Sequence, residues 1–205
     1  MPASQRSQDI LAFHEHCHAS VGWAKKAPAL HAMGFWKFLE LNHRFNCLLW
    51  DEEDLARRQL VAATEIAGNK RAIDGFNQKR NDAIEGMDEA LLEGLSPIVR
   101  KPGARLSSET AGSMVDRLSI VSLKIHHMRL QTRRVDVDQS HIDNCRARLQ
   151  RLNEQRRDLA GCFDRLVAEA ASGEAWFKIY RQFKMYNDPN LNPSIYGEAL
   201  FPNKA

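Results

Sequence analysis

The sequence has no long apolar run and no marked excess of either charge. No segment approaches the roughly 18 uninterrupted apolar residues that a membrane span requires, so we expect no transmembrane helix. Lysine and arginine together number 29 against 26 aspartate and glutamate residues, a net charge of +3. Nucleic-acid-binding proteins usually carry a strong basic excess, so the charge gives no strong nucleic-acid signal. The N-terminal segment lacks the apolar core of a secretory signal, and we expect a cytoplasmic protein.

Cysteine is also scarce, and its spacing matches no known framework. The four residues, Cys17, Cys47, Cys145 and Cys162, show no CxxC motif. In a chain without a secretory signal they indicate reduced, mostly buried thiols. We therefore predict neither a disulfide scaffold nor a zinc site built from these four cysteines.

Strand signals are absent, whereas helical periodicity runs through nearly the whole chain. The pattern predicts helices over residues 7–24, 35–60, 67–95, about 108–133 and 138–171, followed by a short helix from Gly173 to about Met185. Prolines and glycine at 96–108 predict an internal linker loop. We therefore predict one all-α domain over residues 1–205, an antiparallel bundle of five or six helices with an irregular C-terminal tail. The apolar run at 118–125 should make its helix the most buried.

Polar side chains interrupt the core stripes of the helices expected at 35–60 and 67–95. They are Asn42, Asn46 and Glu53 on the first helix, and Asn77, Asn81, Glu85 and Asp88 on the second. Burying an unpaired amide or carboxylate costs roughly 2–7 kcal/mol, so these groups must satisfy one another, bind water or bind a ligand. Sequential helices pack antiparallel, so both sets should face one cleft. Either a polar layer that fixes helix register or a ligand pocket explains them, and we favour the pocket.

Further candidates lie on the helix expected at about 108–133 and in the C-terminal tail. Arg117, Lys124 and His127 fall along one line of that helix. Arg117 and Lys124 would supply positive charge for a phosphate or carboxylate, although a lysine there can also snorkel to water. The tail residues Gln182, Lys184, Asn187 and Asp188 could form a lid over a polar ligand or only satisfy their own turns.

A histidine cluster near the N-terminus, His14, His16 and His18, has the composition of a metal site. On a helix His14 and His18 share a face while His16 points away, so at most two of them could bind the same ion. The sequence shows no third ligand nearby. We do not predict a metal site here, and the role of the cluster stays open.

Four strings resemble the bacterial family known as domain of unknown function 4254: NHRFNCLLWDEEDLAR, NQKRNDAIEGMDE, RLSIVSLKIHHM and YRQFKMYNDPNLNP. They occur in the family's order and cover about residues 35–195. The resemblance implies a helical, intracellular protein, often encoded near glycosyltransferases of envelope polysaccharide assembly. It assigns no roles to its signature positions, which are Asn42, Asn46, Glu52, Glu53, Asn77, Arg80, Asn81, Glu85, Asp88, Lys124, His127, Gln182, Lys184, Asn187 and Asp188.

A weaker likeness concerns all-helical nucleotide pyrophosphohydrolases of the MazG type. These enzymes hold magnesium with an EExxE motif on one helix and ExxD on the next, and this chain resembles them at Glu52-Glu53 and at Glu85 and Asp88. The third glutamate of EExxE would fall at Ala56, which removes the specificity of the motif. The likeness implies a divalent cation such as Mg²⁺, bound by oxygen ligands.

Three functions follow as hypotheses. In the leading one, the cleft binds or acts on a phosphorylated or sugar-containing metabolite of the kind used in envelope polysaccharide metabolism, with Glu53, Glu85 and Asp88 as cation ligands or general base. In the second, the chain is a non-catalytic module that binds a protein such as a glycosyltransferase through the heptad-like helix at 138–171 or the first helix. The third is a metal-dependent pyrophosphohydrolase. The sequence offers no Ser-His-Asp or Cys-His nucleophile system.

Overall fold

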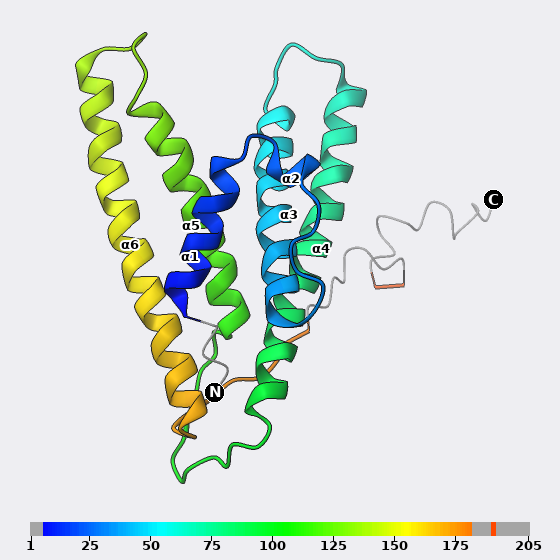
Figure 1. The fold of residues 1–205 in the computed structure, drawn as a ribbon. Coiled ribbons are helices and arrows are strands. Elements are labelled where there is room, and N and C mark those ends of the chain that lie inside the picture. The colour runs from blue at the N-terminus through cyan, green and yellow to red at the C-terminus, as the bar shows by residue number, and fades with distance from the viewer. Residues whose placement is uncertain (1–5, 182–189, 192–205) are drawn as a thin grey trace, which may run out of the picture.

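Two long helical hairpins make up most of the structure, a computed structural model that describes residues 6–181 and 190–191 (Figure 1). One hairpin pairs α3 (Gly34–Ala56) with α4 (Ala63–Leu95), and the other pairs α5 (Ala111–Gln131) with α6 (Gln139–Ala171). Helix α1 (Ser7–Ala19) packs on α5 and α6, and the single-turn α2 (Trp23–Lys26) leads into α3. The prediction of an all-α helical bundle is confirmed for the described residues. None of their helices is long and apolar enough to cross a membrane.

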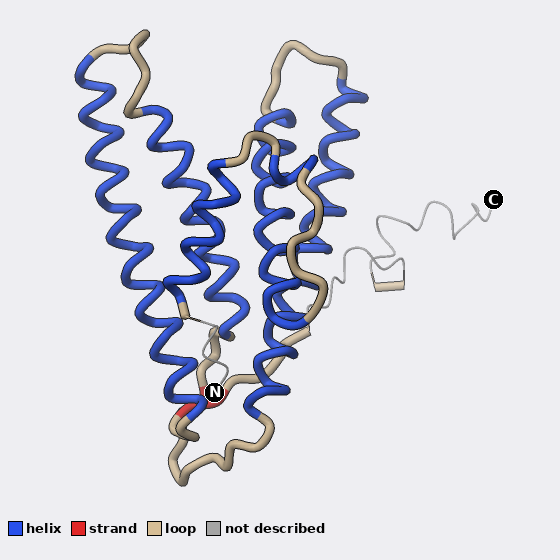
Figure 2. Tube along the Cα trace, viewed as in Figure 1, coloured by secondary structure: helices blue, strands red, loops and turns tan. Residues whose placement is uncertain are grey.

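The only strands among the described residues are two-residue segments at one end of the bundle (Figure 2). Strand β1 (Arg105–Leu106) pairs in parallel with β2 (Ala175–Trp176). The short helix predicted after Gly173 is therefore wrong over residues 174–181, which contain no helix. Gly173 follows the last turn of α6 and has a φ of 76°, the left-handed backbone conformation in which glycine commonly ends an α-helix. The chain then runs extended through β2, and Phe177 after it is buried in the core. The remainder of the predicted helix lies outside the described residues.

The N-termini of the second hairpin are set by side-chain caps. Thr110 accepts the Ser113 N–H at the start of α5, and Asp138 accepts the His141 N–H at the start of α6. Such caps satisfy backbone donors that the first turn leaves unpaired. The first predicted helix is interrupted because Gly22, with a φ of 73°, turns the chain between α1 and α2.

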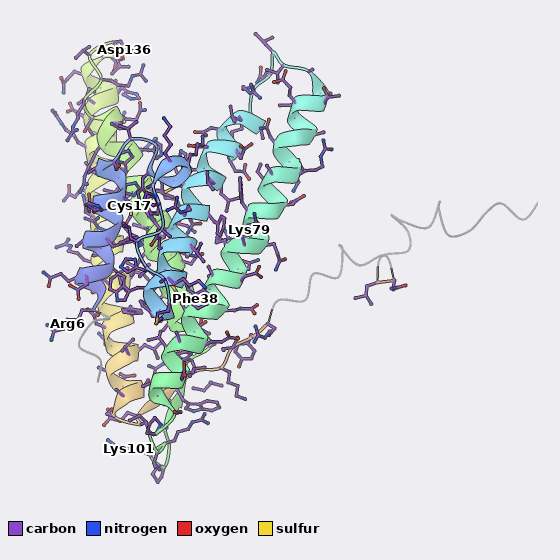
Figure 3. The ribbon with its side chains drawn as sticks, turned by 45° about the vertical axis from the view of Figure 1, so that its right-hand side comes forward. Arg6, Cys17, Phe38, Lys79, Lys101 and Asp136 are labelled. Atoms are coloured by element: carbon purple, nitrogen blue, oxygen red, sulfur yellow. The ribbon has the colours of Figure 1, made fainter. Side chains whose placement is uncertain are left out.

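Helix α5 carries more buried residues than any other helix, as its apolar run predicted. Val115, Leu118 and Ile125 are fully buried. The approach of α4 to α5 is so close that a Cβ on Gly112 would lie 2.6 Å from the backbone oxygen of Ile84. Phe38 of α3 fills the space beside Gly86 of α4 (Figure 3). This packing fixes how α3, α4 and α5 present their polar side chains to one another.

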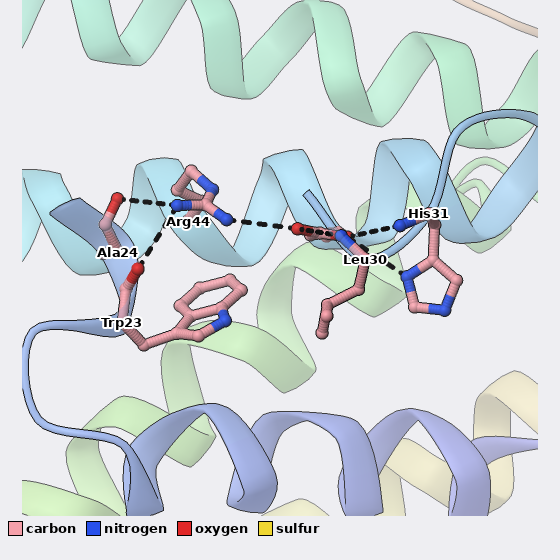
Figure 4. A network of polar contacts seen from close by, with 6 residues as sticks. Trp23, Ala24, Leu30, His31 and Arg44 are labelled. Atoms are coloured by element: carbon pink, nitrogen blue, oxygen red, sulfur yellow. Dashed lines mark hydrogen bonds and ion pairs between the residues drawn. The ribbon is translucent and has the colours of Figure 1, made fainter. Parts of the chain in front are cut away.

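A buried ion pair holds α2 and the following loop against α3 (Figure 4). Glu40 accepts the backbone N–H groups of Leu30, at 2.9 Å, and His31, at 3.0 Å, and it pairs with Arg44 at 3.1 Å. Arg44 donates in turn to the carbonyl oxygens of Trp23 and Ala24. Burial raises the pKa of Glu40, but these donors outweigh it and lower the pKa overall. The contacts bring the end of α1 close to α3.

Candidate functional site

A buried polar network joins α3 to α5 and is centred on Asp116. The Asp116 carboxylate accepts hydrogen bonds from the side-chain amides of Asn42, at 2.8 Å, and Asn46, at 2.9 Å. Asn46 also donates to the Ser119 hydroxyl at 3.0 Å. The guanidinium of Arg80, from α4, lies 3.9 Å from the same carboxylate. Two of the predicted polar residues are therefore satisfied by a carboxylate that the sequence analysis did not single out.

A cleft of about 270 Å³ opens beside this network. It is lined by Asn46, Leu49, Trp50, Glu53, Asp54 and Arg57 of the α3 region, by Asn77 and Arg80 of α4, and by Ile120 and Leu123 of α5. The predicted residues Asn46, Glu53, Asn77 and Arg80 thus meet in one hollow. This is the arrangement expected from antiparallel packing of α3 on α4, and it makes the hollow the candidate ligand site.

Charge is unevenly distributed within the cleft. Arg57 pairs with Glu53 at 3.2 Å and with Asp54 at 3.1 Å, so one guanidinium meets two carboxylates and the outer rim keeps a net negative charge. Deeper in, the Nε atom of Arg80 is buried and donates no hydrogen bond in the described structure, and its ion-pair partner, the Asp116 carboxylate, lies 3.9 Å away. A buried donor without an acceptor is costly, and an oxygen of a bound ligand would satisfy it.

One wall of the cleft is aromatic. The Trp50 ring stacks on His127 of α5, with the ring centroids 4.3 Å apart and the planes at 8°. Burial lowers the pKa of His127, which keeps that ring neutral near pH 7. The stack positions the half-buried Trp50 ring in the cleft that Asn46 and Asn77 also line. A planar aromatic surface next to polar groups is common in sites for sugars and bases.

The predicted carboxylates Glu85 and Asp88 do not line the cleft. Glu85 forms an ion pair with Arg181 at 2.6 Å. Asp88 is buried, and its carboxylate accepts the Gly112 N–H at 2.7 Å in the first turn of α5. Burial raises the pKa of Asp88 to about 6 against the hydrogen bonds that lower it. Asp88 therefore acts as a cap of α5, and Glu85 ties α4 to the segment that follows β2.

The proposed cation site of Glu53, Glu85 and Asp88 is not assembled in the structure. Among the described residues, the group of three ligand side chains close enough to share an ion is His18, His43 and Cys47. Because Glu53 faces the cleft rim and Asp88 caps a helix, the three carboxylates do not form such a group. We therefore do not carry the Mg²⁺ site into the functional proposal.

The remaining predicted residues lie elsewhere. Arg117 pairs with Glu109 at 2.6 Å and lines a separate hollow between α5 and α6. Lys124 is exposed, and Glu52 accepts a hydrogen bond from Asn69 at 2.7 Å. Asn81 is buried and accepts one from Arg80 at 3.4 Å. Gln182, Lys184, Asn187 and Asp188 lie outside the described residues.

Sequence reasoning missed several residues of this region, among them Trp50, Arg57 and Asp116. The sequence could have indicated the role of Asp116. This carboxylate lies two residues before the apolar run at 118–125, where burial is costly unless a polar partner satisfies it. Trp50 and Arg57 sit at the end of α3, and only the position of α5 shows that they border a cleft.

The heptad-like stripe of α6, a candidate surface for a protein partner, is largely covered by the chain itself. Ile142, Cys145, Leu159, Phe163 and Leu166 are all buried. Helix α6 packs against α5, α1 and β2. The stripe therefore serves intramolecular packing.

Comparison with protein families gives a match over residues 36–179 to a family described as protein of unknown function, DUF4254. The match covers most of the chain and agrees with the resemblance carried by the sequence motifs. No curated protein and no solved structure shows significant similarity to this chain.

Proposed function

Since the chain belongs to the DUF4254 family, proteins of unknown function, its function has to be argued from its own site, and we propose that the cleft between α3, α4 and α5 binds a phosphorylated or sugar-containing metabolite. The observation that carries this proposal is the buried Nε of Arg80, which makes no hydrogen bond and only a 3.9 Å ion pair with Asp116, in a cleft also lined by amides, carboxylates and a tryptophan.

The charge pattern supports a ligand with two chemically different parts. A guanidinium binds phosphate through charge-assisted hydrogen bonds, so the anionic part would lie toward Arg80. The carboxylates of Glu53 and Asp54 at the rim would repel a phosphate but accept hydrogen bonds from hydroxyl groups. Asn77 would orient the same hydroxyls. A sugar phosphate or nucleotide sugar has this polarity.

The aromatic wall supports the same class of ligand. The face of Trp50 can pack on the apolar face of a pyranose ring or on a nucleobase. Of the carboxylates expected to be catalytic, Glu53 alone lines the cleft, so we assign any proton transfer to it. We place this binding in the bacterial cytoplasm and in envelope polysaccharide metabolism, the setting that the family resemblance suggests.

The competing proposals gain no support from specific contacts. A protein partner would need an uncovered apolar face on α6 or α1, but the stripe of α6 and the apolar residues Ile10 and Cys17 of α1 are buried within the chain. A pyrophosphohydrolase of the expected kind would need the carboxylates of Glu53, Glu85 and Asp88 around one cation. Their separate roles in ion pairing and helix capping do not favour that arrangement.

Thermal melts with four probes test the proposal: inorganic phosphate, glucose, glucose 1-phosphate and UDP-glucose. A ligand that binds only the folded state raises the melting temperature by mass action. We expect the two phosphorylated sugars to raise it more than glucose or phosphate alone. Arg80→Met should abolish the increase, whereas Arg117→Met, which removes an arginine outside the cleft, should preserve it. No response to any probe, or equal losses in both variants, would contradict the proposal.

A further inference from the structure

Helices α1 and α3 bring a second cluster of side chains together on the other side of the Asp116 network. His14 and His18 share one face of α1, and His43 and Cys47 share one face of α3, each pair four residues apart. The His14 and His43 rings stack with centroids 4.3 Å apart, and His18 meets His43 edge-on at 4.9 Å. Helix α3 therefore supplies the further ligand groups that the sequence of α1 lacked.

The ligand atoms of this cluster lie at separations close to those of a metal site. One ligand atom each from His18, His43 and Cys47 lies within 4.8 Å of the other two. The Cys47 Sγ is 3.8 Å from the His43 Nε2. Tetrahedral zinc, with bonds of about 2.0–2.1 Å to nitrogen and 2.3 Å to sulfur, holds neighbouring nitrogen and sulfur ligands about 3.6 Å apart. Small side-chain rotations would close the remaining distance.

The hydrogen bonds of the cluster are arranged as in metal sites. The Nδ1 of His43 lies 2.8 Å from the Ser119 hydroxyl, which leaves the Nε2 facing Cys47. Metal-binding histidines usually have their other ring nitrogen fixed by such a partner. His126 of α5 stacks on His18, with centroids 4.7 Å apart, and holds that ring in place.

Two buried imidazole nitrogens of the cluster lack partners in the described structure. The Nε2 atoms of His14 and His18 are both buried without a hydrogen bond, and the His14 side chain is fully buried. Unsatisfied buried polar atoms are uncommon and costly. A bound cation would satisfy the buried Nε2 of His18.

We propose that His18, His43 and Cys47 form a binding site for a transition-metal cation of the Zn²⁺ type. The ligand set is two imidazoles and one thiolate, which suits Zn²⁺ and does not suit Mg²⁺ or Ca²⁺. Binding breaks the S–H bond of Cys47, forms the metal–sulfur bond, and releases the thiol proton to solvent. His18 is only half-buried, so a water molecule can fill the fourth position from that side.

The test uses full-length protein freed of metal by a chelator and titrated with Co²⁺, whose bond to a thiolate gives a charge-transfer absorption band. We expect wild type to bind one Co²⁺ per chain with that band, and Zn²⁺ to displace it and raise the melting temperature. Cys47→Ser should lose the band, while Cys162→Ser, at an exposed cysteine, should keep it.

A matched histidine pair on α1 completes the test. Loss of an outer hydrogen-bond partner weakens metal binding about 10- to 100-fold, so His18→Gln, which removes a direct ligand, should weaken Zn²⁺ binding at least about tenfold. His16→Gln, at an exposed position, should leave it unchanged. The Co²⁺ spectrum of wild type tests the proposal even if a variant does not fold. Absence of a thiolate band in wild type, or its persistence in folded Cys47→Ser, would overturn the proposal.

Discussion

His43 and Asn46, one turn apart on α3, make hydrogen bonds to the same hydroxyl group. The Nδ1 of His43 lies 2.8 Å and the Nδ2 of Asn46 lies 3.0 Å from the Oγ of Ser119. His43 belongs to the histidine–cysteine cluster, and Asn46 lines the cleft. The two candidate sites therefore meet at Ser119 of the most buried helix. The Ser119 hydroxyl is the group through which His43 and Asn46 are connected.

The first prediction concerns Asp116, which accepts both buried asparagine amides. Asp116→Leu keeps a similar volume but leaves the amides of Asn42 and Asn46 without this acceptor. Each unsatisfied buried donor costs about 1–3 kcal/mol, so we expect the two together to lower the free energy of unfolding by about 2–6 kcal/mol, measured by urea denaturation. Asp74→Leu, at an exposed position of α4, should change it by less than about 0.5 kcal/mol. Similar losses in both variants would show that the network contributes little.

The second prediction concerns two helical glycines with opposite surroundings. A Cβ at Gly112 would meet the Ile84 backbone oxygen and the Asp88 carboxylate, whereas one at Gly161 would have open space around it. Gly112→Ala should lose about 1–3 kcal/mol through overpacking. Gly161→Ala should gain about 0.5–1 kcal/mol, because alanine favours a helix interior over glycine. Stability changes of the same sign in urea denaturation would contradict the described approach of α4 to α5.

The third prediction follows from the buried carboxyl of Asp88. Its pKa is about 6 in the folded state, against the ordinary value of 3.8 that applies to the unfolded chain. Between these two values the folded state therefore binds more protons than the unfolded state. The contribution of Asp88 to stability is therefore full below pH 3.8 and is lost as the pH rises toward 6, by as much as about 3 kcal/mol.

Comparison with Asp88→Asn isolates this effect from other titrating groups. Asparagine can still accept the Gly112 N–H but carries no titratable proton. The stability of Asp88→Asn relative to wild type should therefore rise between pH 4 and about 6 and stay constant above that range. Denaturation at a series of pH values measures the difference, and a pH-independent difference would rule out a raised pKa at Asp88.

The sequence predicted the bundle well because helical periodicity and an apolar run report burial directly. The run at 118–125 marked α5 as the most buried helix. Of the polar interruptions on α3 and α4, Asn46, Glu53 and Asn77 line one cleft, whereas the other four do not. The functional role of Asp88 could not be predicted in the same way. A carboxylate on a core stripe suggests catalysis as readily as capping, and only the position of the α5 N-terminus distinguishes the two.

The histidine–cysteine cluster shows the same limit. His14 and His18 were recognised as sharing a face, but the two residues that join His18 in the proposed site, His43 and Cys47, lie on α3, at least 25 residues beyond His18 in the sequence. The four-residue spacing of His43 and Cys47 was a local signal that could have been read. That α1 and α3 place these two pairs together depends on tertiary packing, including the contacts of Glu40 and Arg44 that hold α2 on α3.

The central claim, that the cleft between α3, α4 and α5 binds a phosphorylated sugar, is tested most directly by an NMR titration of isotope-labelled protein with glucose 1-phosphate and UDP-glucose. We predict that the Trp50 indole N–H, the Asn77 side-chain amide and the Arg80 Nε–H shift together and saturate with a single dissociation constant for at least one of the two ligands. Shifts confined to the hollow around Arg117, or no saturable shift at these three groups with either ligand, would contradict the claim.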